Sequence, residues 1–289
     1  MMWLSRRWQL VLMLAPALLV YTGYLVYPVF YSVFFSFSDY NGVSGAKPVG
    51  AANYVQMWHD ALFWSSMRNT LVILAIAVLV LVPLAFLVAA LLSGPVRGAG
   101  VLRALIFAPA IVAPILIGLI WVFILDPSVG LINALLISLG VSGPQWIGGT
   151  TLTPVSVSMV YVWQMIGFIV TIFYAGLKML PRDVLEASEL DGANRWQQLR
   201  YVTIPMLQET FGICTVLAIT GVFKIFELVY VLTGGGPVHL SDVLVSYMYY
   251  ITFQQQNYGY GLSMAVVICV LGAAASIGFL ALRRRGGRA

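Results

Sequence analysis

Long apolar stretches alternate with shorter polar ones along the whole chain. Because a helix needs about 20 mostly apolar residues to cross a bilayer, the pattern predicts about six transmembrane helices. The predicted spans are Trp8 to about Phe37, about Thr70 to Leu92, about Ala104 to Leu125, about Pro154 to Leu177, about Glu209 to Leu232 and about Gly259 to Leu282. The predicted fold class is all-α, a polytopic integral membrane protein in which residues 1–289 form a single transmembrane domain.

The composition excludes a water-soluble domain. Hydrophobic residues make up 61% of the 289 positions and charged residues 9%, and the mean hydropathy is +0.95. Soluble proteins carry about 25% charged residues. The net charge of +5 would suggest a nucleic-acid partner in a soluble chain, but here we expect it to report topology, with no nucleic acid involved. Cys214 and Cys269 lie in apolar runs without suitable spacing, which indicates neither a disulfide nor a metal site.

The first apolar run follows Arg6 and Arg7. A cleaved signal peptide is the alternative interpretation, because Ala15-Pro16-Ala17 resembles a processing site. The apolar part of a signal peptide normally ends after about 7–15 residues, and this run continues well beyond that length. We therefore expect an uncleaved first span with its basic end in the cytoplasm.

The basic residues collect in alternate loops. Twelve lie on the predicted inner side: Arg6, Arg7, Arg97, Arg103, Lys178, Arg182, Arg195, Arg200, Arg283, Arg284, Arg285 and Arg288. Lys47 and Arg68 fall on the predicted outer side, and Lys224 lies within a span. Cytoplasmic loops carry an excess of Lys and Arg, so this bias predicts that both termini and the 178–208 loop are cytoplasmic. The segments 38–68, 126–153 and 238–258 are then extracytoplasmic.

The loop 178–208 is charged and helix-forming in an otherwise apolar chain. Glu186, Ala187 and Glu189 favour a helix, whereas Asp191-Gly192 favours a break. We expect a short helix, a turn at Gly192 and a second short helix running to Pro205. An ordinary solvated connector is the alternative for any such loop.

The loop also carries a motif. It resembles the signature of the membrane-spanning subunits of ATP-binding-cassette importers, which reads E-A-A, three residues, G, nine residues and I-x-L-P. The matching positions are Glu186, Ala187, Gly192 and Pro205, and the departures are Ser188 for the second alanine, Val202 for isoleucine and Ile204 for leucine. Further similarity from about residue 33 to 282 is closest to permeases of the maltose and glycerol-3-phosphate type of carbohydrate importer. The resemblance implies the type I importer permease fold and a location in the bacterial cytoplasmic membrane.

The resemblance also implies a docking site. Residues Glu186 to Ala193 are expected to form a coupling helix that sits in a cleft of a separate ATPase subunit. The expected coupling residues are Glu186, Ala187, Ser188, Glu189, Asp191, Gly192 and Ala193. Glu186 is the first choice for a charged anchor, with a helix cap or an internal salt bridge as the alternative.

The implied assembly contains this permease, a second homologous permease, two ATPase subunits, an extracytoplasmic solute-binding protein and a sugar-like substrate. The sequence has no Gly-x-x-x-x-Gly-Lys-Ser/Thr motif, so we expect ATP and Mg on the partner ATPases and no cofactor or catalytic residue on this chain. Sugars, polyols and glycerol phosphate all remain open as cargo.

Ionisable residues inside a membrane are costly and are by default candidates for function. Lys224 and Glu227 lie in the predicted fifth span at a spacing that allows an ion pair in a helix. The candidate substrate-pathway residues are Gln164, Phe223, Lys224, Phe226, Glu227 and Tyr230. The alternatives are a structural ion pair for Lys224 with Glu227, and a hydrogen bond to a neighbouring helix for Gln164.

Two other classes of function compete. An ion-coupled secondary transporter predicts midspan acids and internal repeats, whereas the chain has one obvious midspan acid, Glu227, and no evident repeat. An intramembrane enzyme predicts an HExxH pair or a histidine beside a serine nucleophile within a span, and neither pattern is present in the sequence.

Overall fold

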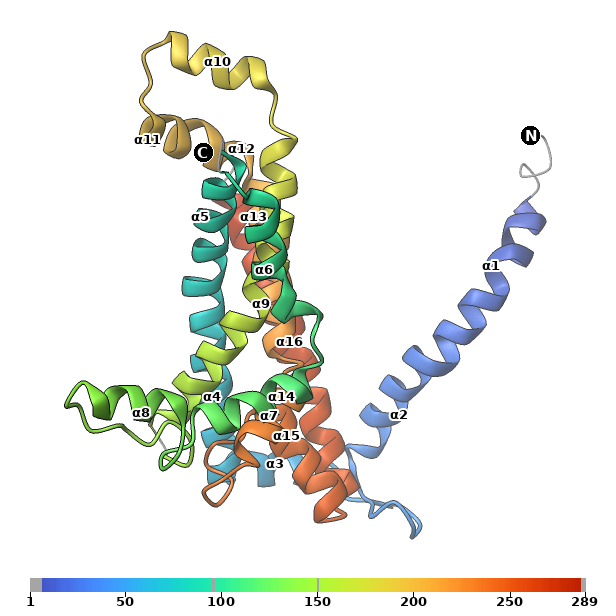
Figure 1. Ribbon diagram of the computed structural model, residues 1–289. Coiled ribbons are helices and arrows are strands. Elements are labelled where there is room, and N and C mark those ends of the chain that lie inside the picture. Colours follow the sequence, from blue (N-terminus) through green and yellow to red (C-terminus); the bar gives the residue numbers. More distant parts are fainter. Residues whose placement is uncertain (1–6, 95–96, 150, 287–289) are drawn as a thin grey trace. The chain divides into compact units, whose positions relative to one another are not determined.

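The computed structural model describes residues 7–94, 97–149 and 151–286 (Figure 1). Their regular secondary structure is almost entirely helical. The chain divides into two compact units, one formed by residues 1–60 and 248–270 and the other by 61–247 and 271–289. Arg6 and Arg288, which count toward the predicted charge bias, lie outside the described residues.

The first unit begins with one long helix. Its parts are α1 (Arg7–Tyr21), the π-helical turn η2 (Thr22–Val26) and α2 (Tyr27–Phe35). Its apolar side chains remain exposed or half-buried, as expected for a helix that faces lipid. The first predicted span, Trp8 to about Phe37, is thus helical as far as Phe35.

Short elements follow this helix in the same unit. They are the antiparallel strands β1 (Ser38–Asp39) and β2 (Lys47–Pro48), helix α3 (Ala52–His59), the π-helical turn η5 (Tyr250–Gln254) and the start of α16 (Tyr258–Gly286). Asn53 is buried and donates through Nδ2 to the carbonyls of Ser36 and Ser38, at 2.8 and 3.0 Å. The hydroxyl of Tyr260 donates to Asp60 at 2.6 Å. These bonds fix the polar end of the first unit.

The second unit is built around two long helices. One consists of α4 (Ala61–Ile76), η3 (Ala77–Leu81) and α5 (Val82–Ser93), and the other is α9 (Thr153–Lys178). Around them lie α6 (Ala99–Ile111), α7 (Pro114–Ile124), α8 (Leu131–Ser138), α13 (Gln208–Val222), α14 (Glu227–Thr233) and α15 (Leu244–Tyr249), the last of which runs on into the first unit. Three packed rings, Phe86, Phe173 and Phe211, join α5, α9 and α13 with centroids 4.7 to 5.5 Å apart. The core of the unit is therefore apolar side chains held between helices.

Within the described residues, four helices are long and apolar enough to cross a membrane, and the number rises to six if each of two bent pairs counts as one span. The four are Val11–Phe35, Ala61–Ser93, Thr153–Lys178 and Tyr258–Arg283. The second begins at Ala61, where the sequence predicted Thr70. Its first turns bury Phe63, Ser66 and Asn69, so tertiary contacts extend the helix beyond the apolar run. Arg68 therefore belongs to a helix and not to an outer loop.

The third predicted span, Ala104 to Leu125, is wrong as a continuous helix. Helices α6 and α7 meet at an angle of 99° across Val112 and Ala113. Both linking residues are extended, with ψ of 136° and 135°. A residue before proline avoids the helical region, and Pro114 also lacks the N–H that would continue α6. Pro114 instead opens α7.

The fifth predicted span, Glu209 to Leu232, is also interrupted. Helix α13 ends at Val222 and α14 begins at Glu227, with a turn between them. The N–H groups of Lys224 and Ile225 donate to the carbonyls of Gly221 and Val222 at 3.1 and 3.2 Å, as in a tight turn. At its other end, α13 follows the loop helices at an angle of 70°.

Candidate coupling loop and membrane site

The loop after α9 folds as a helix, a turn and a second helix. Its elements are α10 (Arg182–Leu190), α11 (Arg195–Gln198), the π-helical turn η4 (Leu199–Thr203) and α12 (Ile204–Met206). Gly192 has φ of +81°, a left-handed conformation that glycine adopts without strain. The N–H groups of Asp191, Gly192 and Ala193 each donate to a carbonyl of the last turn of α10, at 3.0 Å. The helix, turn and helix predicted from the sequence are present.

The bounds of the first helix differ from the expected Glu186 to Ala193. Helix α10 begins earlier, at Arg182, because Pro181 immediately precedes it in an extended conformation. It ends at Leu190, so Asp191, Gly192 and Ala193 form the turn. Figure 1 shows α10 and α11 at the end of the second unit where α5 terminates, with α7 and α14 at the opposite end.

Helix α10 exposes its acidic face. Glu186, Ala187 and Glu189 are exposed, and Leu190 is 89% exposed. In the described part of the chain, Glu186 makes no ion pair, since the ion pair found there joins His239 with Asp242. The internal salt bridge considered as the alternative role of Glu186 therefore has no support in the geometry.

Ser188 has a different role from its exposed neighbours. It is half-buried, and its hydroxyl donates to the carbonyl of Leu185 at 2.7 Å. Nε2 of Gln198 on α11 donates to the same carbonyl at 3.0 Å and to Oγ of Ser188 at 2.9 Å. Asn194 and Gln197 form a capping box that starts α11 and so positions Gln198. One amide thus braces α10 against α11, a contact that the sequence did not reveal.

We expect Gln198→Leu to loosen α10 without unfolding the membrane helices. Each lost hydrogen bond contributes about 1 kcal/mol, so amide hydrogen exchange in 182–190 should accelerate by roughly tenfold or more. Arg200→Ala, which removes an exposed side chain of the same segment, is the matched control. Unchanged exchange in Gln198→Leu would show that the brace does not hold α10.

The candidate residues of the fifth span are placed differently from expectation. Lys224 lies in the turn between α13 and α14, and Glu227 is the first residue of α14; both are exposed. The described residues contain no ion pair between them, so the pairing that the spacing allows is not formed there. The i, i+3 argument requires a continuous helix, and the helix is broken there.

The aromatic candidates divide into two environments. The rings of Phe226 and Tyr230 stack with centroids 5.3 Å apart, and Tyr230 is 42% exposed. Phe223 is instead buried, next to Gly272 of α16. Of these aromatic candidates, only the Phe226–Tyr230 pair therefore offers a partly exposed ring face close in the chain to Lys224 and Glu227.

Gln164 lies within the helix packing. It is 2% exposed, and its Nε2 donates to the carbonyl of Val112 at 3.4 Å. The break between α6 and α7 removes the helical N–H donor that would otherwise bond to this carbonyl. Gln164 supplies a hydrogen bond in its place. This geometry matches the structural alternative considered for Gln164.

The predicted outer segment 238–258 is anchored by side-chain contacts that the sequence did not reveal. Nδ2 of Asn69 donates to the carbonyls of Leu240 and Asp242 at 2.8 and 2.9 Å. Nδ1 of His239 lies 2.8 Å from Oδ2 of Asp242, which is 4% exposed. The Asn-Thr pair at the start of an apolar run was the available signal, because polar side chains there need partners.

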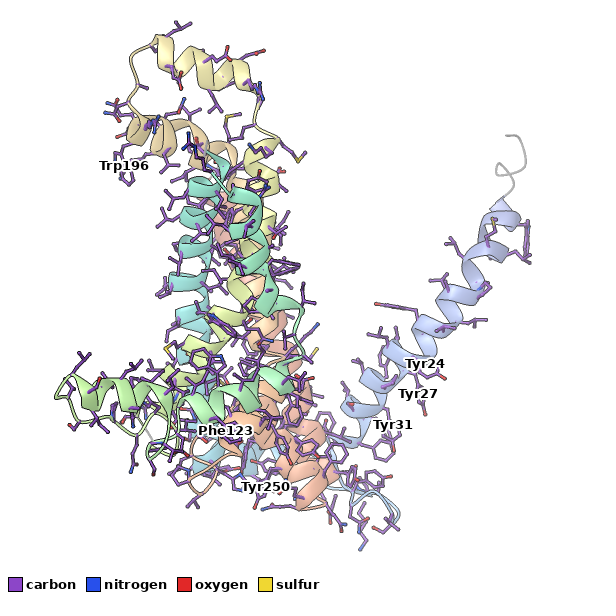
Figure 2. The ribbon with its side chains drawn as sticks, in the orientation of Figure 1. Tyr24, Tyr27, Tyr31, Phe123, Trp196 and Tyr250 are labelled. Carbon is purple, nitrogen blue, oxygen red and sulfur yellow. The ribbon has the colours of Figure 1, made fainter. Side chains whose placement is uncertain are left out.

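Side chains on the second loop helix face outward. Trp196 of α11 is 64% exposed, and Figure 2 shows it pointing away from the helices. Tyr201, five residues later, is 70% exposed. Exposed aromatic residues of this kind are typical of membrane boundaries and of docking surfaces.

Comparisons with known proteins agree with this architecture. The family described as "Binding-protein-dependent transport system inner membrane component" matches residues 81–286. The "Probable ABC transporter permease protein YurN" of Bacillus subtilis (strain 168) is 31% identical over 92% of this chain and 92% of its own. The "Diacetylchitobiose uptake system permease protein NgcF" of Streptomyces coelicolor is 30% identical, covering 95% of this chain and 82% of its own.

Solved structures show the same fold at lower identity. A chain of the bacterial alginate ABC transporter in complex with alginate pentasaccharide-bound periplasmic protein superposes with a TM-score of 0.83. It is 20% identical and covers 96% of this chain and 94% of its own. The predicted all-α membrane fold is confirmed, and so is the prediction of a transport subunit that is not itself an enzyme. The chain belongs to the family of inner-membrane permease components of binding-protein-dependent ABC transport systems.

Proposed function

We propose that this permease forms half of the translocation pathway of an ATP-driven importer for a sugar or a related polyol. The observation that carries the proposal is α10, a rigidly braced helix that projects from the membrane helices with its acidic face free. A helix of this kind suits docking to a partner better than a solvated connector, which would need no brace. The names of relatives, such as the "Lactose transport system permease protein LacF", support the carbohydrate class.

The assembly we propose has a second homologous permease, two ATPase subunits that hold ATP and Mg, and an extracytoplasmic solute-binding protein. Helix α10 would sit in a cleft of one ATPase, with Glu186 pairing with a basic residue of the cleft. ATP would drive transport only if ATP itself binds more tightly to one of two conformational states of the assembly than to the other. The residues of the turn, Asp191 to Ala193, set the direction in which α10 projects.

We infer the topology from charge. The predicted inner side carries Arg97, Lys178, Arg182 and Arg195, so the 178–208 loop and both termini lie in the cytoplasm of a bacterial cell. The segments 38–68, 126–153 and 238–258 then face outward, where 238–258 would meet the solute-binding protein. Hydrogen bonds from the N–H groups of Val129 and Ser128 lower the pKa of Asp126, so this turn keeps its negative charge at neutral pH.

The candidate pathway residues remain part of the proposal with altered roles. Lys224, Glu227 and the stacked Phe226–Tyr230 pair would contact substrate, because aromatic faces beside hydrogen-bonding groups suit a sugar. Gln164 and Phe223 would shape the pathway from within the packing.

We expect Lys224→Ala and Glu227→Ala to weaken uptake independently. Loss of one substrate hydrogen bond costs about 1 kcal/mol, so each should raise the half-saturating substrate concentration roughly fivefold and the double variant roughly 25-fold. Lys47→Ala, on the hairpin of the first unit, is the control. A double variant no worse than either single one would indicate a coupled pair, contrary to the unpaired geometry.

Co-purification tests the proposal against its rivals. The tagged permease should bring a second permease and an ATPase out of mild detergent, and the purified set should hydrolyse ATP faster with the loaded solute-binding protein. A secondary transporter would move solute alone along an ion gradient, and an intramembrane enzyme would alter its substrate. Uptake into vesicles by this chain without nucleotide would contradict the proposal.

A further inference from the structure

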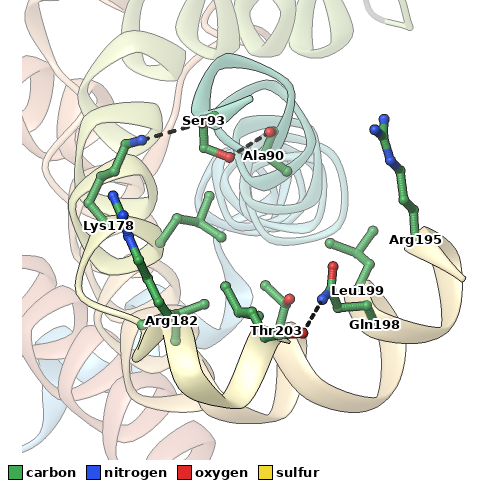
Figure 3. A pocket seen from close by; sticks show the side chains of 11 residues that line it. Ala90, Ser93, Lys178, Arg182, Arg195, Gln198, Leu199 and Thr203 are labelled. Atoms are coloured by element: carbon green, nitrogen blue, oxygen red, sulfur yellow. Dashed lines mark hydrogen bonds between the residues drawn. The ribbon is translucent and has the colours of Figure 1, made fainter. Parts of the chain in front are cut away.

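A pocket of about 340 Å³ lies between the coupling loop and the ends of two membrane helices. Ser93 at the end of α5 and Lys178 at the end of α9 form one wall. Arg182 from α10, Arg195 and Gln198 from α11 and Thr203 from η4 form the rest of its polar lining (Figure 3). A pocket of this size accommodates a small charged group.

The lining carries three cations and no acidic residue. Nζ of Lys178 donates to the carbonyl of Ser93 at 3.3 Å. Figure 3 shows Lys178 and Arg182 next to each other, with Arg195 across the pocket. In the described part of the chain, neither arginine has a hydrogen-bond acceptor or an ion-pair partner. The acids of α10, which are Asp183, Glu186, Glu189 and Asp191, do not contribute to the lining.

The pocket lies where two spans leave the apolar region. The spans Ala61–Ser93 and Thr153–Lys178 end at residues that themselves line it. Lipid phosphates lie just beyond the hydrocarbon core, and therefore at this depth. Lys178 also lies over the ring of Tyr174, 5.5 Å from its centroid, as a cation does when its stem packs along an apolar helix end.

We propose that this pocket binds the phosphate of an anionic phospholipid headgroup from the inner leaflet. Phosphate oxygens accept strong hydrogen bonds from guanidinium and ammonium groups, and basic pockets between membrane helices on the cytoplasmic side suit such headgroups. A bound headgroup links the ends of α5 and α9 to α10 and α11, so coupling depends on anionic lipid. The proposal rests on the cytoplasmic placement of the loop given under the proposed function.

The depth of the pocket favours a lipid over a carboxylate of the ATPase. An ATPase in contact with α10 would meet its exposed face, which carries Glu186 and Glu189. The pocket lies on the other side of the brace, where Gln198 and Leu185 close it. A ligand reaching this wall comes from the membrane boundary.

The test uses the assembled complex. Native mass spectrometry should find phosphatidylglycerol retained by the wild type, and Lys178→Gln/Arg182→Gln/Arg195→Gln should reduce that retention by about tenfold or more. ATP-driven uptake should be several-fold faster in vesicles containing phosphatidylglycerol than in pure phosphatidylcholine, and the triple variant should lose this difference. Arg97→Gln, a basic residue of the inner side outside the pocket, is the matched control and should keep both properties.

Arg195→Gln alone is the second variant, chosen because it changes one exposed residue and spares the ends of the membrane helices α5 and α9. It should lower lipid retention while the complex stays intact. Equal retention in wild type and variants would overturn the proposal, as would loss of the ATPase from the variants without a change in lipid. Competition by millimolar inorganic phosphate at constant lipid would show a free-anion site and also overturn it. Uptake and ATPase activity of the Arg97→Gln control test the proposed importer function independently of the lipid site.

Discussion

Replacing Gly192 with proline is expected to abolish coupled uptake and leave the permease in the membrane. Gly192 has φ of +81°, whereas a proline ring fixes φ near −65°. The substitution also removes the N–H that donates to Glu189 at 3.0 Å. The mismatch costs about 3 kcal/mol or more, comparable with the whole brace on α10, so α10 should lose its position while the spans persist. Uptake should fall by at least tenfold in vesicles, with basal ATP hydrolysis retained.

Gly192→Asn is the matched control. Asparagine adopts the left-handed conformation at small cost, and a Cβ at this position meets nothing within 4 Å. This variant should keep most of its uptake. Normal uptake by Gly192→Pro would show that the turn does not position a coupling element.

Reversing the charge of Glu186 tests the proposed anchor separately from the turn. Glu186→Lys leaves α10 intact because the side chain is exposed and makes no ion pair in the described residues. It should weaken retention of the ATPase by about tenfold or more, since a like charge would then face the basic cleft. Glu186→Gln should have a smaller effect of the same sign. ATPase retention equal to wild type in Glu186→Lys would remove this residue from the interface.

The second large effect is expected at Gly167, where α6 crosses α9. A Cβ there would collide with the carbonyl oxygen of Ile106 and with Cα of Phe107. These are backbone atoms, which cannot turn aside as a flexible side chain would. Gly167→Leu should therefore separate the helices and cost about 3 kcal/mol or more, seen as a loss of folded protein and a lower Tm in detergent.

Gly278→Leu on α16 is the control for helix propensity and size. Gly278 is exposed, and a Cβ there meets nothing within 4 Å. It should fold and melt like the wild type. A Gly167→Leu variant equal to this control would contradict the close crossing of α6 and α9.

Most of the helices could be predicted from the sequence, because apolar length alone determines them. The breaks between α6 and α7 and between α13 and α14 could not be predicted from the sequence. Pro114 was compatible with a tolerated kink, and only the packing of α7 against α14 makes it a bend of 99°. The break at Phe223 to Phe226 has no glycine or proline, so it arises from tertiary contacts such as that of Phe223 with Gly272.

The loop 178–208 shows the same limit. Helix formers and Asp191-Gly192 predicted its helix and turn. The contact of Gln198 with Ser188 depends on how the turn folds α11 back onto α10, and no local pattern encodes it. Ser188 stands where the motif has alanine, and its hydroxyl accepts the hydrogen bond from Gln198 that an alanine could not accept. The basic pocket was missed because its cations come from three different elements.

Site-specific crosslinking would show whether α10 docks on a separate ATPase in the cytoplasm. A single cysteine replaces Leu190, which is 89% exposed, in a chain with Cys214 and Cys269 removed. A cysteine at Val43, 95% exposed in the predicted outer segment, serves as the reference. We expect a crosslink from position 190 to the ATPase subunit and none from position 43. A crosslink from position 43, or none from position 190 in an active complex, would contradict docking by α10.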